Sequence, residues 1–485
     1  MRLSLSRAGA ALAPMMLLLG LTAGSCAGRG SGPDDPAGRT NVVFVLTDDL
    51  SANLVQYMPN VQALARDGTT FSQYTVTDSL CCPSRSSIFT GRFPHNTGVF
   101  TNSGDDGGFH VFQREQERDT FATTLQKRGY RTAMMGKYLN GYLPQEHGVR
   151  PGWTEWDVAG AGYPEYNYNL NENGQVKHYG KAPGDYLTTV IEGKAKAFVA
   201  AAAKAGEPFL LEVATFSPHG PYTPAPQDEQ AFPGLKAPRG PSFDTLPAHA
   251  PAWLAGREPL SAGQVAAIDT AYRKRVQSVQ SVDRMIGDLR QTLEQAGVAD
   301  RTAVVFSSDN GFHLGEHRLA AGKQTAFDHD VHVPLVVAGP GVLKGATVDA
   351  PVQNIDLRPT FEEFGGVPTE KSVDGRSLVP LLRGHPASGR PKIGLVEHHG
   401  PGNAADDPDR QDPASGNPPT YAALRGPDFT YVEYQGGGTE YYERTADPDE
   451  LVNAVATLSS ERAAQLHGAL EKLRTCKGSD ACGGG

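Results

Sequence analysis

The chain has no excess of basic residues, no long uninterrupted hydrophobic run and no internal repeat. Its 485 residues include 44 Lys and Arg against 54 Asp and Glu, a net charge of −10. This balance does not favour nucleic acid or an anionic membrane surface as a partner. The longest apolar stretch, Ala8–Leu21, is interrupted by Pro14 and is too short to predict a membrane span. Cysteine is also scarce, with five residues in total.

The N-terminus has the pattern of an export signal. Arg2 and Arg7 form a basic region, an apolar stretch follows, and small residues lead to Cys26. A small-residue stretch that ends in cysteine also resembles a bacterial lipoprotein cleavage site, although Ala stands where Leu is usual. We therefore expect residues 1–26 to be a signal peptide and 27–38 a flexible tether. The protein is predicted to be exported, either as a cell-surface lipoprotein anchored through lipid on Cys26 or as a freely secreted protein.

Short apolar runs alternate with helical patterns through most of the mature chain. Strands are expected at Asn41–Leu46, Tyr130–Met135, Phe209–Ala214, Thr302–Ser307 and Val333–Ala338. Helices are expected at Phe121–Arg128, Lys194–Ala205 and Ser261–Ala296. This alternation predicts an α/β fold with a mostly parallel sheet flanked by helices. Ligands of such folds bind beyond the carboxyl ends of the strands.

The pattern changes after about residue 375, which predicts a large domain over 39–375 and a smaller one over 376–485. Short β-like runs occupy Tyr421–Gln435, and Leu458–Leu473 is expected to be a helix. The smaller domain should therefore be an antiparallel sheet with a helix. Pro401–Pro419, rich in Pro, Gly, Asp and Asn, is expected to be a mobile loop.

Two pairs of oxygen-bearing side chains directly follow predicted strands. Asp48 and Asp49 follow the first strand, and Asp309 and Asn310 follow a later one. Hard divalent cations such as Ca²⁺ or Mg²⁺ prefer carboxylate and amide oxygens. Either pair alone is more typical of a turn after a strand. Both pairs together, in a chain that also carries the cysteine motif described next, predict one metal site.

The motif Cys-Cys-Pro-Ser-Arg begins at Cys81 and is followed by Thr90 and Gly91. The motif alone also fits a buried cysteine pair at the start of a helix, with Pro83 in the first turn. The order Cys-x-Pro-Ser-Arg with a following Thr-Gly resembles the recognition sequence of the sulfatase family. In that family the first cysteine is converted to formylglycine (3-oxoalanine). The resemblance implies that Cys81, not Cys82, is modified, by a formylglycine-generating enzyme.

The resemblance extends to the last cysteines and implies an alkaline-phosphatase-like fold and a metal site. Sulfatases bind Ca²⁺ through two early aspartates, a later Asp-Asn pair and formylglycine itself. Carried onto this sequence, the ligands of Ca²⁺ or Mg²⁺ are Asp48, Asp49, Asp309, Asn310 and the modified Cys81. The implied reaction is attack on sulfur by a hydroxyl of hydrated formylglycine, followed by release of sulfate.

Cationic side chains are expected to surround the sulfate. Arg85, Lys137 and Lys323 match sulfatase cations, which stabilise charge on the reacting group. His219, in the segment Ser-Pro-His-Gly-Pro, is the best candidate for the general acid. Lys323 is the alternative proton donor to the departing alcohol.

The resemblance is greatest to N-acetylglucosamine-6-sulfatases and heparan 6-O-endosulfatases. The stretch 136–140 (Gly-Lys-Tyr-Leu-Asn) supports it, since many arylsulfatases have histidine at the position of Leu139. The implied substrate is a sulfated glycan with 6-O-sulfated N-acetylglucosamine. His313 could line its pocket or orient neighbouring groups. Glu397 and His398 are candidate sugar contacts, but they fit exposed residues at a strand end equally well.

The two cysteines nearest the C-terminus, Cys476 and Cys482, flank a short turn-like segment. In an oxidising compartment they are expected to form a disulfide, because a zinc site would need more ligands than this segment offers. Cys82 is expected to be a small buried filler.

Two other functions compete with a sulfatase. The first is a phosphomonoesterase or phosphonate hydrolase on the same fold, which commonly uses Ser or Thr and His-rich zinc ligands that this chain lacks. The second is an exported glycan-binding lipoprotein without activity. The presence of every expected catalytic residue argues against this alternative.

Overall fold

The computed structural model describes residues 39–401, 407 and 410–483 of the chain. The predicted signal peptide, the tether and the lipidation of Cys26 lie outside these residues, as does the centre of the predicted loop Pro401–Pro419. Within the described part, none of the helices is both long enough and apolar enough to cross a bilayer.

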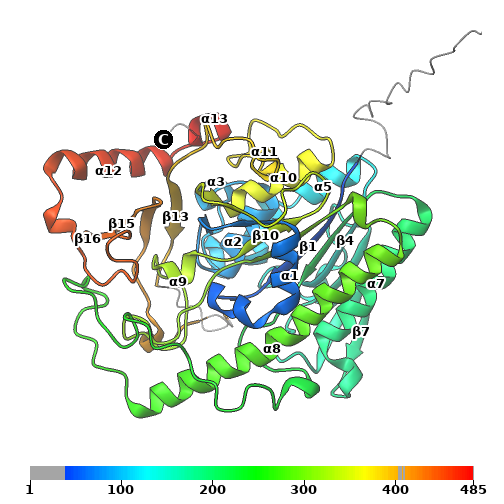
Figure 1. Ribbon diagram of the computed structural model, residues 1–485, viewed down its shortest axis with the longest axis horizontal. Coiled ribbons are helices and arrows are strands. Elements are labelled where there is room, and N and C mark those ends of the chain that lie inside the picture. Colours follow the sequence, from blue (N-terminus) through cyan, green and yellow to red (C-terminus); the bar gives the residue numbers. More distant parts are fainter. Residues whose placement is uncertain (1–38, 402–406, 408–409, 484–485) are drawn as a thin grey trace, which may run out of the picture.

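A large mixed sheet with a parallel centre runs through the molecule (Figure 1). Its parallel strands are, in spatial order, β9 (Thr302–Ser308), β1 (Asn41–Thr47), β8 (Phe209–Ala214), β4 (Arg131–Lys137) and β5 (Glu155–Ala159). One edge carries β10 (Leu335–Ala338), β2 (Thr69–Phe71) and β11 (Ala346–Val348), and the other carries β6 (Tyr168–Glu172) and β7 (Gln175–Tyr179). The mostly parallel sheet is confirmed. Strand β10, however, pairs antiparallel to β9, so its amino end lies at the edge where the parallel strands end.

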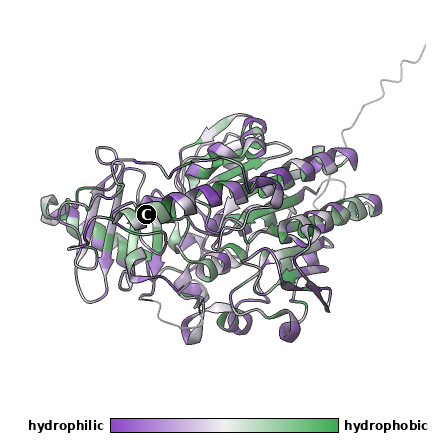
Figure 2. Ribbon diagram, turned by 90° about the horizontal axis from the view of Figure 1, so that it is seen from below, coloured by the Kyte–Doolittle hydropathy of each residue, from purple (hydrophilic) through white to green (hydrophobic). Residues whose placement is uncertain are grey.

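Helices cover both faces of this sheet because alternate residues of the strands point to opposite sides. On β1, Val43 and Val45 pack in one core cluster, whereas Phe44 and Leu46 pack in the other. The first cluster includes residues of α1 (Pro59–Asp67), α7 (Leu187–Ala205) and α8 (Ala262–Gln295). The second includes residues of α2 (Cys81–Thr90), α4 (Gly108–Glu115), α5 (Phe121–Lys127) and α10 (Leu357–Phe364). Figure 2 shows the resulting apolar strands between helices with hydrophilic outer surfaces.

Helix α7 begins about two turns before the predicted start at Lys194. Its first part carries Leu187 and Ile191, which are buried in the core at a spacing of one turn. The Ala/Lys composition of residues 194–205 predicts a helix there, but it does not predict the first two turns of α7.

A second, antiparallel sheet lies beside the large one, as predicted (Figure 1). Its strands are β13 (Gly394–His398), β14 (Tyr421–Arg425), β15 (Phe429–Tyr434) and β16 (Thr439–Glu443), and α12 (Ser460–Leu473) packs on it. The backbone N–H of Glu397 donates to the carbonyl of Thr77 at 2.8 Å, which ties β13 to the segment before Cys81. A disulfide joins Cys476 and Cys482.

Shorter elements complete the described chain. They are β3 (Tyr74–Thr75), β12 (Val352–Gln353), α3 (Pro94–Thr97), α6 (Pro144–His147), α9 (Asp328–Val331), α11 (Val379–Leu382) and α13 (Ser479–Cys482). Helix α11 follows residue 375, yet its apolar residues pack in the core of the large sheet.

Candidate active site

The two predicted pairs of oxygen-bearing residues meet at one edge of the sheet. Asp48 and Asp49 follow β1, Asp309 and Asn310 follow β9, and these strands are parallel neighbours. The Asp49 backbone N–H donates to Asp309 Oδ1 at 3.1 Å, and Asn310 Nδ2 donates to Asp49 Oδ1 at 2.7 Å. All four side chains are buried. The predicted convergence of strand ends is therefore confirmed.

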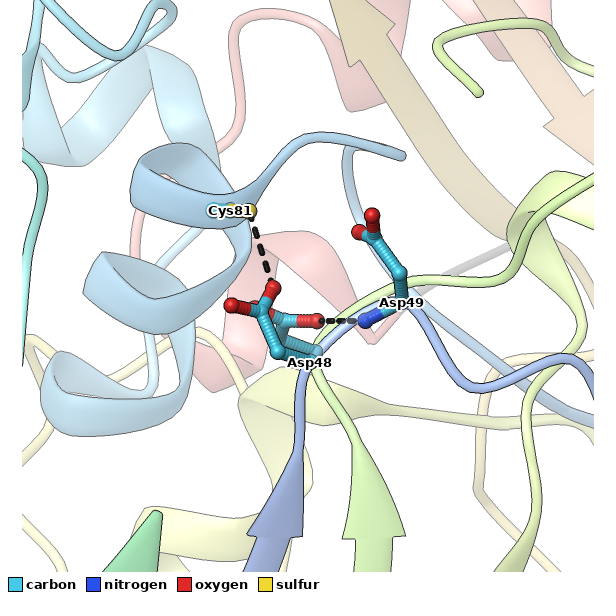
Figure 3. A group of neighbouring side chains, drawn as sticks. Asp48, Asp49 and Cys81 are labelled. Atoms are coloured by element: carbon cyan, nitrogen blue, oxygen red, sulfur yellow. Dashed lines mark hydrogen bonds between the residues drawn. The ribbon is translucent and has the colours of Figure 1, made fainter. Parts of the chain in front are cut away.

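Cys81 is the first residue of α2 and faces this cluster (Figure 3). Its Sγ lies 3.3 Å from Asp48 Oδ1. Cys81, Asp48, Asp49 and Asp309 each offer a ligand atom, and these atoms all lie within 4.8 Å of one another. The amino end of a helix carries partial positive charge and stabilises anions. Position 81 is thus a suitable place for an anionic reacting group.

Two lysine ammonium groups approach Cys81 from different strands and loops. Lys137 Nζ donates to Asp48 Oδ2 at 2.5 Å and lies 3.3 Å from Cys81 Sγ. Lys323 Nζ donates to Asp49 Oδ1 at 2.6 Å and lies 3.0 Å from the same sulfur. Lys137 is the last residue of β4, whereas the sequence suggested that it follows the strand. Both lysines are buried, so their charges act in a largely water-free environment.

Arg85 lies one turn after Cys81 on α2 and donates hydrogen bonds to Asp309 and to the backbone of Lys137. Its Nε donates to Asp309 Oδ2 at 2.7 Å, and its Nη1 donates to the Lys137 carbonyl at 3.0 Å. Burial by itself would lower the pKa of Arg85, but the charges of Asp309 and Asp48 raise it. The guanidinium therefore stays charged and holds both a predicted metal ligand, Asp309, and the backbone of Lys137.

The donor set fits a hard divalent cation. Each of the three carboxylates has one cationic partner: Asp48 has Lys137, Asp49 has Lys323 and Asp309 has Arg85. The formal charges of these six groups therefore balance. Asn310 Oδ1 is buried and has no hydrogen-bond partner among the described residues. A buried amide oxygen beside three carboxylates is the kind of ligand that Ca²⁺ or Mg²⁺ takes.

His219 lies at the open side of the cluster. Its Nδ1 is 2.8 Å from the Gly220 carbonyl, which can only accept, so Nδ1 carries a proton. Its Nε2 lies 3.7 Å from Asp49 Oδ2. The side chain is 10% exposed, against 3% for Lys137 and Lys323. Of these three groups, His219 is best placed to meet the alcohol part of a substrate.

His313 is buried and holds protein groups with both ring nitrogens. Nδ1 lies 2.9 Å from Asp330 Oδ1, and Nε2 donates to the Ser415 carbonyl at 2.8 Å. Of its two predicted roles, these contacts match the orientation of neighbouring groups. The nearby His317 is also buried and stacks on Phe327 at 3.9 Å between ring centroids.

Glu397 and His398 lie on β13 and are both buried, so the alternative that they are exposed strand-end residues is wrong. Glu397 Oε2 lies 2.8 Å from Nδ1 of His95, another histidine of the sequence. His398 Nδ1 lies 3.6 Å from Asp78 Oδ1. None of these contacts includes Cys81, and a role of Glu397 and His398 in substrate binding stays a prediction.

Two residues that sequence reasoning did not single out also position the site. Arg275 of α8 is buried and donates to the backbone carbonyls of Asp49 and, at 3.2 Å, Pro218. It lies on the buried stripe of that helix, where a charged residue is itself a signal. The amide of Gln411 accepts from the Lys323 backbone N–H at 2.7 Å and donates to its carbonyl at 2.5 Å. Gln411 lies in the Pro401–Pro419 segment, and no pattern indicated it.

Comparison with known proteins agrees with this geometry. The sequence model of the sulfatase family matches residues 40–367. The chain is 35% identical over 497 aligned positions to human N-acetylglucosamine-6-sulfatase, covering 96% of this chain and 89% of that protein. A protein solved in complex with its substrate D-glucosamine-2-N,6-O-disulfate superposes with a TM-score of 0.76, at 22% identity, over 90% of this chain and 97% of that one.

The fold by itself does not distinguish sulfate from phosphonate chemistry. Phosphonate monoester hydrolase from Silicibacter pomeroyi superposes with a TM-score of 0.68, at 22% identity, over 91% of this chain and 96% of that one. The family match and the identity to the human sulfatase decide the assignment. The chain belongs to the sulfatase family and is a sulfuric ester hydrolase.

Proposed function

We propose that the enzyme removes 6-O-sulfate from N-acetylglucosamine of a sulfated glycan, with formylglycine at position 81 and one Ca²⁺ or Mg²⁺. The observation that carries the proposal is the position of Cys81 Sγ, in contact with Asp48, Lys137 and Lys323. The similarity to human N-acetylglucosamine-6-sulfatase over 96% of the chain supports the choice of sugar.

Formylglycine at position 81 would supply hydrated-aldehyde oxygens as the nucleophile and for release of sulfate. A divalent cation would be held by Asp48, Asp49, Asp309 and Asn310, and would supply positive charge beside the sulfate. The carboxylates and cations of the cluster balance, so a bound divalent cation leaves a surplus of positive charge. An anionic sulfate ester suits that surplus.

The other side chains of the site have separate roles in the proposed reaction. Lys137 and Lys323 flank position 81 and stabilise charge on the sulfate oxygens, an effect that is largest where water is excluded. Arg85 keeps Asp309 in place. His219, when protonated at Nε2, gives that proton to the departing sugar oxygen.

We further propose export through the N-terminal signal, with lipid on Cys26 or free secretion, and division of the mature chain near residue 375. The basic and apolar leader supports export. Maturation requires a formylglycine-generating enzyme as a partner.

The proposal is tested on protein made together with a formylglycine-generating enzyme. Mass analysis of the peptide that contains Cys81 should show the aldehyde, and Cys82 should remain a thiol. The kcat/KM for 6-sulfo-N-acetylglucosamine should exceed that for a 2-O-sulfated uronate and for nitrophenyl sulfate. Faster hydrolysis of either of the last two would refute the substrate and leave the sulfatase assignment intact.

A further inference from the structure

Asp78 and His398 form a pair of buried polar side chains that lack hydrogen-bond partners. Both Asp78 carboxylate oxygens and both His398 ring nitrogens are without a partner within the described part of the chain. Both side chains are fully buried, and His398 Nδ1 lies 3.6 Å from Asp78 Oδ1. This separation is too long for a hydrogen bond. A buried polar group without a hydrogen-bond partner destabilises the folded state, so such a pair requires an explanation.

The pair lies next to the catalytic centre. Asp78 precedes Cys81 by three residues, and the charge of Lys323 acts on its carboxyl group. The neighbouring Ser79 donates to the Thr325 carbonyl at 2.9 Å, which fastens this segment to the one that carries Lys323. The pair therefore borders the group that contacts Cys81.

The small sheet closes the other side of the pair. His398 ends β13, and its ring packs against Tyr421 of β14 at 5.2 Å between centroids. The Tyr421 hydroxyl donates to the Gln324 carbonyl at 3.2 Å, next to Lys323. Asp78 and His398 thus lie where the small sheet meets the catalytic loops.

A neutral hydroxyl group suits this pair better than a charged group. Burial raises the pKa of Asp78 well above its ordinary value and lowers the pKa of His398 to about 4, so burial disfavours the charged form of both groups. One oxygen atom can lie about 2.8 Å from both partners, because their separation of 3.6 Å is less than twice that distance. A hydroxyl both donates and accepts, which matches a carboxyl and an imidazole together.

We propose that Asp78 and His398 bind one hydroxyl group of the sugar whose sulfate reacts at position 81. The pair thereby makes the enzyme select sugar sulfates over aryl sulfates. A site built to bond a hydroxyl discriminates against a substrate without it, since the protein groups are then left unpaired. The inference rests on the proposed function of the Cys81 site, but not on which sugar is preferred.

The test uses two variants that keep side-chain shape and remove the polar atoms, Asp78→Leu and His398→Phe. Because neither side chain has a hydrogen-bond partner among the described residues, both variants should fold with thermal midpoints close to that of the parent. His399→Asn is the matched control, since His399 is the next residue but is partly exposed and pairs with Asp106. The kcat/KM is measured for the preferred sugar sulfate, for its monodeoxy analogues and for nitrophenyl sulfate.

The parent should lose about 10- to 100-fold in kcat/KM on one monodeoxy analogue. Asp78→Leu and His398→Phe should each reduce kcat/KM for the intact sugar sulfate by a similar factor. On the deoxy analogue, each variant should have nearly the same kcat/KM as the parent has on that analogue. Nitrophenyl sulfate should be hydrolysed by both variants within about threefold of the parent rate. His399→Asn should match the parent on every substrate.

Equal losses on sugar and aryl sulfates would overturn the inference, because the pair would then only support Lys323 or the fold. Unchanged activity of both variants on sugar sulfates would overturn it too. A preference of the parent for a sugar sulfate other than 6-sulfo-N-acetylglucosamine would refute the proposed substrate alone, and the deoxy series of the preferred sugar then tests the pair. A parent that hydrolyses no sugar sulfate would refute both.

Discussion

Replacing Glu212 by glutamine should remove one defined contribution to the pH dependence of stability. Glu212 lies in β8 at the centre of the sheet, in register with Phe44 of β1 and Met134 of β4. It is fully buried, and neither carboxylate oxygen has a hydrogen-bond partner among the described residues. Burial raises the pKa of Glu212 from 4.5 to about 8, although the charge of Arg85 opposes the rise.

The direction in which stability changes with pH follows from the proton that Glu212 keeps in the folded state. Between pH 4.5 and 8 the folded protein keeps the Glu212 proton, whereas the unfolded chain releases it. The contribution of Glu212 to the free energy of unfolding is therefore greatest below pH 4.5 and is lost as pH rises to about 8. The loss is about 1.4 kcal/mol for each pH unit, so the whole window amounts to on the order of 5 kcal/mol.

The assay is urea unfolding at pH 5, 6.5 and 8 for the parent, for Glu212→Gln and for Glu363→Gln. Glu363 is exposed on α10 and is the matched control. A buried glutamine also lacks partners, but this cost does not change with pH. The parent and Glu363→Gln should lose stability toward pH 8, and Glu212→Gln should lose roughly 3–4 kcal/mol less than either of them between pH 5 and 8. A slope for Glu212→Gln as steep as that of the parent would refute the reasoning.

Five further substitutions test the site and the C-terminal disulfide. Cys81→Ser should trap a sulfated enzyme or abolish turnover, seen by mass analysis and rate, whereas Cys82→Ser should retain activity; turnover of Cys81→Ser at the parent rate would contradict the mechanism. Asp309→Ala should lose bound metal and activity together in elemental analysis, and two zinc ions in the parent would instead support a phosphatase. His219→Gln should slow the hydrolysis of a sugar sulfate about 100-fold or more. It should slow the hydrolysis of nitrophenyl sulfate far less, because the nitrophenolate leaving group needs no proton. Equal slowing of both reactions would exclude His219 as the general acid. Cys476→Ser should lower the free energy of unfolding by about 2 kcal/mol, measured by denaturant titration, since it opens a short loop, and an unchanged value would argue against a stabilising disulfide.

The sequence alone determined the elements whose signals are local. The apolar run of Phe209–Ala214 predicted β8 with its observed bounds. The meeting of Asp48 and Asp49 with Asp309 and Asn310 was also predictable, because parallel neighbouring strands bring their carboxyl ends to the same edge. The alternative interpretation of the cysteine motif, a buried pair at a helix start with Pro83 in the first turn, matches the observed start of α2 at Cys81.

Tertiary structure decided which side chains meet across long stretches of chain. Lys323 contacts Cys81 from 242 residues away, and only the folded loops determine that both lysines reach the same sulfur. The partnership of Arg85 with Asp309 and the pairing of Asp78 with His398 depend on side-chain approach between separate elements. The hydrophobic periodicity of a sequence does not encode such distances. It indicates which face of a helix or strand is buried, but not which buried polar atoms contact one another.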